Sequence, residues 1–273
     1  MTASDSASAL TIVVPTYNER GRLGALLERL FAACDREGLA IDVVVVDDNS
    51  ADGTGDVADE WATRRAVRVI HRIGKLGLGS AVLEGLALAR TEIVGVMDAD
   101  LSHPPELLPK LFRTITSRGL DVVVASRYIP GGGTAMWPLR RQLLSRLACA
   151  LTRPVTPVRD AMSGFFMLRR ERLSGFRTSV RGFKIGLEIL VRSRPRSLAE
   201  VAYVFVDRTD GVSKMSFKEG FGFLTQLVRL YGDAIRGAIR WPAYLTFPDA
   251  GQREEPLNDA APRTRAATGH PAV

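Results

Sequence analysis

The sequence lacks several features that would place it in particular classes of protein. Its 273 residues include only two cysteines, Cys34 and Cys149, and neither belongs to a Cys-x-x-Cys or Cys/His cluster, so we expect both to be reduced packing residues. No apolar run reaches the roughly 18 residues of a membrane-spanning helix. Residues 1–9 are small and polar and do not resemble a secretion signal. We therefore expect a cytoplasmic protein with a flexible N-terminus.

Acidic residues are scarce in the middle of the chain. The net charge is +7, and between Arg127 and Arg196 the only acids are Asp160, Glu171 and Glu188. Such a charge distribution predicts an anionic partner. A nucleic acid is one alternative, but the arginines are not interleaved with aromatic residues and no reading module is present. We predict no nucleic-acid binding.

Short runs rich in β-branched residues alternate with segments of helical spacing. This alternation predicts an α/β fold with a doubly wound, mostly parallel sheet and helices on both faces. The expected helices cover residues 19–38, 80–90 and 184–191, and a further one begins at Pro104. The expected strands are Leu10 to Pro15, Ile41 to Asp47, Val67 to His71, Ile93 to Met97, Asp121 to Ser126, Gly164 to Leu168 and Glu200 to Val206.

The last predicted helix, at about residues 216–240, is amphipathic. Its apolar residues recur at Phe221, Leu224, Val228, Tyr231 and Ile235. We expect its first half to pack as core. Its second half, ending in Arg236, Arg240 and Trp241, is typical of an anchor in the membrane interface. One catalytic domain over residues 10–240 is predicted, followed by a disordered tail over 241–273.

The nucleotide-binding motifs of other α/β families are absent. The first strand ends in Pro15-Thr16-Tyr17-Asn18-Glu19, without the glycine fingerprint of a dinucleotide-binding fold. In the run from Gly74 to Ser80, Lys75 comes too early for a phosphate-binding loop of an ATPase. A glycine-rich turn that enters a helix can still present amides to a phosphate. That interpretation and a plain tight turn are equally compatible with the sequence.

Two acidic loops follow predicted strands. The segment Met97-Asp98-Ala99-Asp100 ends the fourth strand, and Asp47-Asp48 ends the second. A single Asp-x-Asp is more often an acidic turn that caps a helix. Two such loops converge on one edge of a parallel sheet, where ligands of this fold class bind. Carboxylate oxygens at this place favour Mg²⁺ or Mn²⁺ together with a nucleotide diphosphate.

Eight segments, in order, resemble the family-2 glycosyltransferases of the GT-A fold, and among them the dolichol- or polyprenol-phosphate mannose synthases. The resemblance extends from Ile12 to about Ser216. The segments are VVPTYNE (13–19), VVDDNSADGTG (45–55), GKLGLGSA (74–81), MDADLSHPPE (97–106), ASRY (125–128), SGFFMLRRE (163–171), GFKIGLEIL (182–190) and DRTDGVSKMS (207–216).

The resemblance implies an inverting transfer of mannose from GDP-mannose to a polyprenyl phosphate, with Mg²⁺ or Mn²⁺ as cofactor. Asp98 and Asp100 would hold the metal, with Ser102 where some relatives complete the metal shell. The implied nucleotide-sugar site comprises Pro15, Tyr17, Glu19, Asp47, Asp48, Lys75, Asp98, Ala99 and Asp100. The implied acceptor-phosphate site comprises Arg127, Arg208, Lys214 and one of Arg140 or Arg141. The implied partners are the nucleotide sugar, the polyprenyl phosphate and the inner face of a membrane, bound peripherally.

Arginine suits the acceptor site because its guanidinium binds a phosphate with two parallel hydrogen bonds. Asp98, Asp100 and Arg127 are therefore the predicted catalytic residues. For Arg127 the alternative is a surface arginine at a strand end, paired with Asp121 or Glu171. His71 and His103 are expected to be neutral packing or capping residues. A phosphate acceptor is already anionic, so we predict no essential strong base.

Two other functions fit parts of the sequence. The same fold would serve a transferase that uses UDP-glucose or another nucleotide sugar with the same lipid acceptor. A membrane-associated adaptor that keeps the fold without catalysis would not need Asp98 and Asp100. Substitution of these two carboxylates separates the enzyme from the adaptor.

Overall fold

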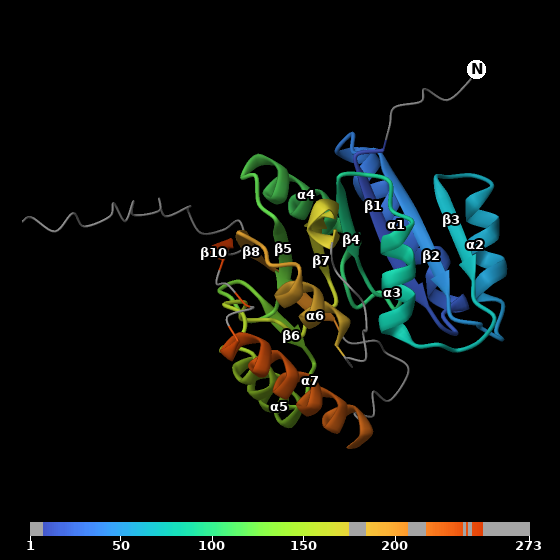
Figure 1. The fold of residues 1–273 in the computed structure, drawn as a ribbon. Coiled ribbons are helices and arrows are strands. Elements are labelled where there is room, and N and C mark those ends of the chain that lie inside the picture. The colour runs from blue at the N-terminus through green and yellow to red at the C-terminus, as the bar shows by residue number, and fades with distance from the viewer. Residues whose placement is uncertain (1–7, 175–183, 207–216, 237–238, 240–241, 248–273) are drawn as a thin grey trace, which may run out of the picture.

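The fold of the computed structural model is built on one central sheet of eight strands (Figure 1). The structure describes residues 8–174, 184–206, 217–236, 239 and 242–247. The strands follow the order β10-β8-β5-β7-β4-β1-β2-β3. Their bounds are β1 Leu10–Thr16, β2 Ile41–Asp47, β3 Val67–His71, β4 Ile93–Val96, β5 Val122–Ser126, β7 Phe166–Arg169, β8 Ser197–Ala202 and β10 Ala243–Phe247.

Helices connect the strands, and a small sheet lies beside the main one. The small sheet pairs β6 (Gly133–Ala135) with β9 (Val204–Val206) in parallel. The helices are α1 Arg20–Arg36, α2 Thr54–Ala62, α3 Leu78–Ala87, α4 Leu108–Ser117, α5 Leu139–Leu151, α6 Ile185–Arg192 and α7 Phe217–Ile235, with short 3₁₀ turns η1 Pro105–Leu107 and η2 Arg170–Leu173.

The sheet is buried on both faces because its strands carry apolar residues on both sides. In β1, Ile12 and Val14 face one cluster of buried residues and Val13 faces the other. The first cluster includes residues of α1 and α4, and Trp61 of α2 packs against it. The second cluster includes residues of α3, α6 and α7. The predicted doubly wound sheet with helices on both faces is confirmed.

One strand of the main sheet runs against the others. β7 lies between β5 and β4 and is antiparallel to both, whereas all other neighbours in the main sheet are parallel. β4 and β5 therefore do not pair with each other. The carboxyl ends of β4, β1, β2, β5 and β8 share one edge of the sheet, which we call the C-edge.

The C-terminal part differs from the sequence-based expectation in two ways. Residues 243–247 lie within the predicted tail, yet they form β10, an edge strand parallel to β8. The predicted amphipathic helix is present as α7, but its buried residues include Gln226, Leu227 and Leu230. Phe221 and Leu224 are exposed, so the expectation that this stripe packs as core in the first half is wrong. Within the described ranges, no helix combines the length and apolarity needed to cross a bilayer.

Candidate functional site

The two acidic loops lie at the C-edge, as predicted. β1 pairs with β4 on one side and with β2 on the other. The backbone N–H of Met97 donates to Val13 O (3.1 Å), and that of Asp48 donates to Thr16 O (2.9 Å). These bonds extend the strand pairing to the first residues of both loops. Parallel strands in adjacent register thus place Asp98 and Asp47 on either side of the end of β1.

The carboxylate of Asp98 is accessible and is flanked by one buried histidine. The side chain of Asp98 is 39% exposed, and its Oδ2 lies 3.7 Å from Nε2 of His103. The backbone N–H of Asp98 donates to Nδ1 of the same imidazole at 3.1 Å. Gly164 lies opposite, and a Cβ there would be 3.2 Å from Asp98 Oδ2. The absence of a side chain at Gly164 leaves room around this carboxylate.

Asp100 is oriented by Ser102. The backbone N–H and the hydroxyl of Ser102 both donate to Asp100 Oδ1, at 3.1 and 2.6 Å. Leu101 between them adopts a left-handed conformation with φ of 64°, and Ala99 is buried. Ser102 was predicted as a metal-shell residue. Here its hydroxyl is used to fix Asp100, and the role in the metal shell stays a prediction.

Asp48 fixes the glycine-rich turn. Its Oδ1 accepts from Arg72 Nη1 (2.7 Å) and from the Leu76 N–H (2.8 Å), and its Oδ2 accepts from the Gly77 N–H (2.8 Å). The turn therefore presents these two amides to a protein carboxylate, as the plain-turn interpretation requires. Sequence reasoning missed Arg72, which is buried, because its partner lies 24 residues away.

The remaining predicted nucleotide-site residues differ in accessibility. Tyr17 is 40% exposed, and the Lys75 ammonium lies 3.6 Å from the centre of its ring, a cation–π contact. Asp47 is buried and accepts from the Ser50 hydroxyl and N–H. Two further residues are bound within the fold: the Glu19 carboxylate pairs with Arg22 (3.1 Å), and Pro15 is buried in β1 opposite Val46.

Arg127 is buried and bound to Asp160. Its backbone N–H and Nε donate to Asp160 Oδ2 at 2.9 and 2.7 Å, and its Nη2 donates to Oδ1 at 2.7 Å. Burial disfavours the charge, but the charge and hydrogen bonds of Asp160 raise the pKa of Arg127 above its ordinary value. The alternative pairing with Asp121 or Glu171 is wrong. Asp121 precedes β5, at the opposite edge of the sheet.

Aromatic rings surround the Arg127 guanidinium, and Trp137 brings a second arginine to it. The guanidinium carbon of Arg127 is 5.3 Å from the Trp137 ring centre, and that of Arg141 is 3.9 Å from it. The buried Trp137 Nε1 has no hydrogen-bond partner among the described residues. Arg140 is exposed. The structure thus brings Arg141, and not Arg140, onto the same ring as Arg127.

Other predicted residues are placed as follows. Arg208 and Lys214 lie outside the described residues. His103 is buried between Phe165 and Tyr203, which confirms a packing residue, and burial lowers its pKa. His71 binds Asp59 at 3.0 Å near the surface. Cys34 and Cys149 are free and buried, and burial raises the pKa of each to about 12.

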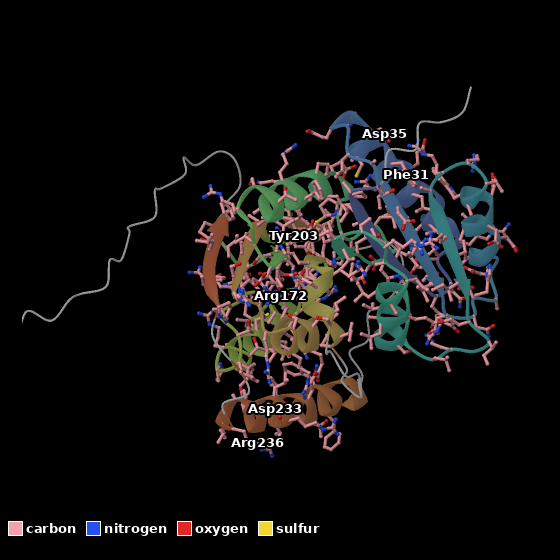
Figure 2. The ribbon with its side chains drawn as sticks, turned by 45° about the horizontal axis from the view of Figure 1, so that its top comes forward. Phe31, Asp35, Arg172, Tyr203, Asp233 and Arg236 are labelled. Carbon is pink, nitrogen blue, oxygen red and sulfur yellow. The ribbon has the colours of Figure 1, made fainter. Side chains whose placement is uncertain are left out.

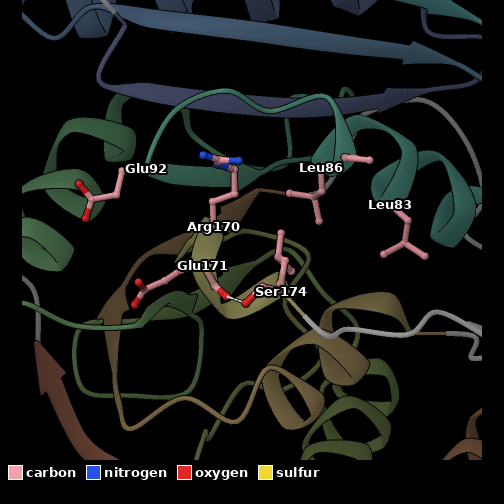
Figure 3. A pocket seen from close by; sticks show the side chains of 8 residues that line it. Leu83, Leu86, Glu92, Arg170, Glu171 and Ser174 are labelled. Atoms are coloured by element: carbon pink, nitrogen blue, oxygen red, sulfur yellow. Dashed lines mark hydrogen bonds between the residues drawn. The ribbon is translucent and has the colours of Figure 1, made fainter.

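Other side chains and one pocket lie outside the two acidic loops. Tyr203, which follows β8, lies in the interior, whereas Asp233 lies in the last turn of α7 and Arg236 directly follows that helix (Figure 2). A pocket between α3 and η2 is lined by Leu83, Leu86, Glu92, Arg170 and Ser174, among others (Figure 3). Glu92 precedes β4 and Arg170 follows the antiparallel β7, so this pocket lies at the edge opposite the C-edge.

The described part of the chain holds no group of three or more His, Cys, Asp or Glu side chains arranged for a metal ion. Asp98 and Asp100 are two carboxylates in one turn. Mg²⁺ commonly completes such a site with water and with the oxygens of a bound substrate.

Comparison with known proteins identifies the family. The model of glycosyl transferase family 2 matches residues 11–176. A dolichol-phosphate mannosyltransferase of Pyrococcus furiosus is 40% identical over 225 residues, which cover 81% of this chain but only 63% of that protein. A polyprenol monophosphomannose synthase of Mycolicibacterium smegmatis is 39% identical over 217 residues, covering 75% of this chain and 80% of the relative.

Solved structures share the fold at low sequence identity. Mannosyl-3-phosphoglycerate synthase from Rubrobacter xylanophilus superposes with a TM-score of 0.60 at 21% identity, covering 85% of this chain and 76% of that one. A mannosyltransferase from Pyrobaculum calidifontis in complex with GDP-Man and Mn²⁺ has a TM-score of 0.55 at 22% identity, covering 84% and 64%. The fold is that of the GT-A glycosyltransferases, and the chain belongs to glycosyl transferase family 2.

Proposed function

We propose that this chain transfers mannose from GDP-mannose to a polyprenyl phosphate, with inversion at the anomeric carbon and with a divalent metal ion. The single observation that carries the proposal is the C-edge itself. It combines an accessible carboxylate turn at Asp98 and Asp100 with a buried, fixed guanidinium at Arg127. The two curated relatives are named for dolichol-phosphate mannose transfer and polyprenol monophosphomannose synthesis, which supports this acceptor and this sugar.

Asp98 and Asp100 are the proposed metal ligands. The hard oxygen donors fit Mg²⁺ or Mn²⁺, and Gly164 leaves space beside Asp98 for an ion and its other ligands. When bound, the ion would neutralise the charge that develops on the leaving diphosphate. Ser102 fixes the carboxylate of Asp100, and His103 fixes the backbone of Asp98, so the turn that carries both carboxylates is ordered before any ligand arrives.

Arg127 and Arg141 are the proposed acceptor-phosphate residues. Three hydrogen bonds to Asp160 prevent Arg127 from swinging away, and Trp137 aligns Arg141 beside it. The unpartnered Trp137 Nε1 is a further donor that an anion would satisfy. A phosphate monoester is already anionic and needs no general base, and the Nδ1 of His103 is occupied by the Asp98 N–H. Arg208 and Lys214 remain proposed as additional phosphate contacts.

The nucleotide is proposed to bind between the Tyr17 and Asp47 loops. Tyr17 offers an exposed ring, and Lys75 places a cation over it. Glu19, Asp47 and Asp48, with Pro15 in β1 and Ala99 between Asp98 and Asp100, complete the proposed site. Of the two aspartates, Asp48 acts through the glycine-rich turn that it holds.

A membrane surface is proposed as a peripheral partner. In α5, Leu139, Leu143 and Leu147 recur at helical spacing and are 70, 58 and 56% exposed. No acidic residue occurs between Met136 and Arg159, and the helix carries Arg140, Arg141 and Arg146. Exposed leucines beside arginines are typical of a helix in the interface of an anionic bilayer, where a lipid acceptor would be met. The inner face of the membrane is the proposed location.

The direct test incubates the protein with vesicles whose bilayer contains polyprenyl phosphate. Mg²⁺ or Mn²⁺ and labelled GDP-mannose or UDP-glucose are added to the solution. We expect label in the lipid only from GDP-mannose and only with metal. Asp98→Asn and Asp100→Asn should each abolish transfer, while circular dichroism shows the fold retained. Label only from UDP-glucose would overturn the donor. Wild-type cellular function in both variants would support the adaptor alternative instead.

A further inference from the structure

A chain of buried and partly buried hydrogen bonds connects β10, an outer strand of the sheet, to Arg127. The Tyr244 hydroxyl of β10 donates to Oε2 of Glu200 in β8. Oε2 also accepts from the Arg159 N–H (2.8 Å), and Oε1 accepts from the Asp160 N–H (2.9 Å). The Asp160 carboxylate then binds Arg127. β10, β8 and β5 lie side by side in the sheet (Figure 1).

The burial of these groups shows that the network is costly unless all its bonds are made. Glu200 and Asp160 are both fully buried, and Arg127 is 7% exposed. A carboxylate in the interior is tolerated only when hydrogen bonds or a cation compensate for the loss of its hydration. Glu200 has no cation among the described residues within ion-pair distance, so backbone amides and the Tyr244 hydroxyl stabilise its charge.

The geometry gives Glu200 control over the turn at residues 159–160. Two consecutive amides of this turn donate to one carboxylate, which fixes the position and direction of the Asp160 backbone. The Asp160 side chain is bound in turn to the backbone and the guanidinium of Arg127. A displacement of the turn would therefore move the guanidinium relative to the acceptor.

We propose that Glu200 and Tyr244 are positioning residues of the acceptor-phosphate site, so that β10 belongs to the support of that site. This inference rests on the proposed function of Arg127. Neither residue contacts a substrate. Glu200 acts through Asp160 on Arg127, and Tyr244 acts by holding Glu200.

The test measures the KM for polyprenyl phosphate, the KM for GDP-mannose and kcat in the full chain. Glu200→Gln removes one of the two acceptor oxygens, and Tyr244→Phe removes only the hydroxyl. Asp121→Asn is the matched control, because Asp121 is also a buried carboxylate that accepts two amides, of Arg196 and Ser197, but at the far edge of the sheet. Tyr231→Phe is the control for Tyr244→Phe. It also removes a tyrosine hydroxyl that donates a hydrogen bond, in this case to Leu151 O.

We expect Glu200→Gln to raise the KM for the lipid acceptor about tenfold, the scale of one full hydrogen bond. Tyr244→Phe should raise it about threefold, the scale of a hydrogen bond that is lost in part. The KM for GDP-mannose should stay unchanged in both variants. Asp121→Asn should lower the melting temperature as much as Glu200→Gln does, without a change in either KM. The inference would be overturned if the control variants raised the acceptor KM as much as the test variants do. The rise would then follow from reduced stability alone.

A double substitution locates the effect. If Glu200 acts through Arg127, Glu200→Gln should change the KM for the lipid acceptor little further in an Arg127→Lys background. The guanidinium that Glu200 positions is already absent from that variant. Additive effects would show that Glu200 acts elsewhere and would overturn the inference.

Hydrogen exchange gives a readout that needs no activity. Glu200→Gln should raise the exchange rate of the amides of residues 127, 159 and 160 above that in Asp121→Asn. An inactive wild-type chain would contradict the proposed function. The exchange rates would then still show whether Glu200 orders the backbone of Asp160 and Arg127. An active wild type with unchanged exchange in Glu200→Gln would contradict the inference alone.

Discussion

One imidazole, that of His103, contacts both the backbone and the carboxylate of Asp98. Its Nδ1 accepts the Asp98 N–H at 3.1 Å, and its Nε2 lies 3.7 Å from Oδ2. Because Nδ1 accepts a hydrogen bond, the proton of the neutral ring is on Nε2, on the side of the carboxylate. Stacking on Phe165 at a ring-centre distance of 5.1 Å fixes the ring. His103 is therefore a structural partner of the proposed metal ligand.

Replacement of His103 tests this relationship. His103→Phe keeps an aromatic ring for stacking but leaves the Asp98 N–H without its acceptor, at a cost of about 1–3 kcal/mol in the free energy of unfolding. The metal concentration for half-maximal transfer should rise on the order of tenfold. Urea denaturation and a metal titration of activity measure the two effects. His103→Asn, which offers an oxygen near the Nδ1 position, should recover part of both; no recovery would contradict the role assigned to Nδ1.

Gly164→Ala tests whether open space beside Asp98 matters. The added Cβ would lie 3.2 Å from Asp98 Oδ2 and 3.4 Å from His103 Cε1, so the carboxylate must shift by a few tenths of an ångström. We expect the metal requirement to rise on the order of tenfold, with little change in the KM for the acceptor. Gly21→Ala is the control, since its Cβ meets no atom within 4 Å. A metal titration that is the same for both variants would count against the proposed metal site.

Gly85→Ala addresses the packing of α3 on the sheet. A Cβ at Gly85 would lie 2.4 Å from Cγ1 of Val13 and 3.1 Å from Cγ2 of Val46, so the helix must move away from β1 and β2. Overpacking of this kind costs about 1–3 kcal/mol in stability. Gly220→Ala in α7, whose Cβ meets nothing within 4 Å, should instead be neutral or stabilising by up to about 1 kcal/mol. Chemical denaturation of the two variants compares them.

The pair formed by Glu106 and Arg29 predicts a pH dependence of stability. The two side chains make parallel hydrogen bonds of 2.9 Å, and the Arg29 hydrogen bond lowers the pKa of Glu106 below its ordinary 4.5. The stabilisation is therefore fully present above pH 4.5 and is lost as the pH falls through the lowered value.

Glu106→Gln should reduce stability at pH 7 by only about 0.5 kcal/mol, because both side chains are 44% exposed and solvent screens the pair. Denaturation midpoints at pH 7 and pH 3 measure the difference between wild type and variant. It should be smaller at pH 3 than at pH 7 and should shrink in 1 M salt. A difference as large at pH 3 as at pH 7 would show that packing, and not charge, is responsible.

The strand and helix pattern was predictable because buried parallel strands carry continuous β-branched runs that helices of regular spacing separate. The same pattern located the C-edge and its acidic loops, since the carboxyl ends of parallel strands fall on one side. β10 was missed because its five residues, AYLTF, follow a proline and precede a segment of tail-like composition. Its place depends on pairing with β8, almost fifty residues earlier.

The partners of the site residues were not predictable. Asp160 lies 33 residues after Arg127 and Glu200 a further 40, and only the antiparallel insertion of β7 and the placement of β8 bring them together. Trp137 and Arg72 carried no local signal, because their roles depend on side chains from other loops. The alternative in which Arg127 pairs with Asp121 fails for the same reason, because the two residues are close in sequence but lie at opposite ends of β5.

The antiparallel strand β7 also constrains the order in which the sheet is completed. β4 and β5 follow each other in the sequence, yet the edge of each that will face β7 has no partner until residues 166–169 have been synthesised. β5, which Arg127 follows, has no partner in the main sheet at that stage, because its other neighbour, β8, comes later still in the sequence. β4 and β5 therefore each expose a strand edge on which an unfinished chain can pair with another. Only the docking of β7 joins β4 and β5 into one sheet and removes those two edges.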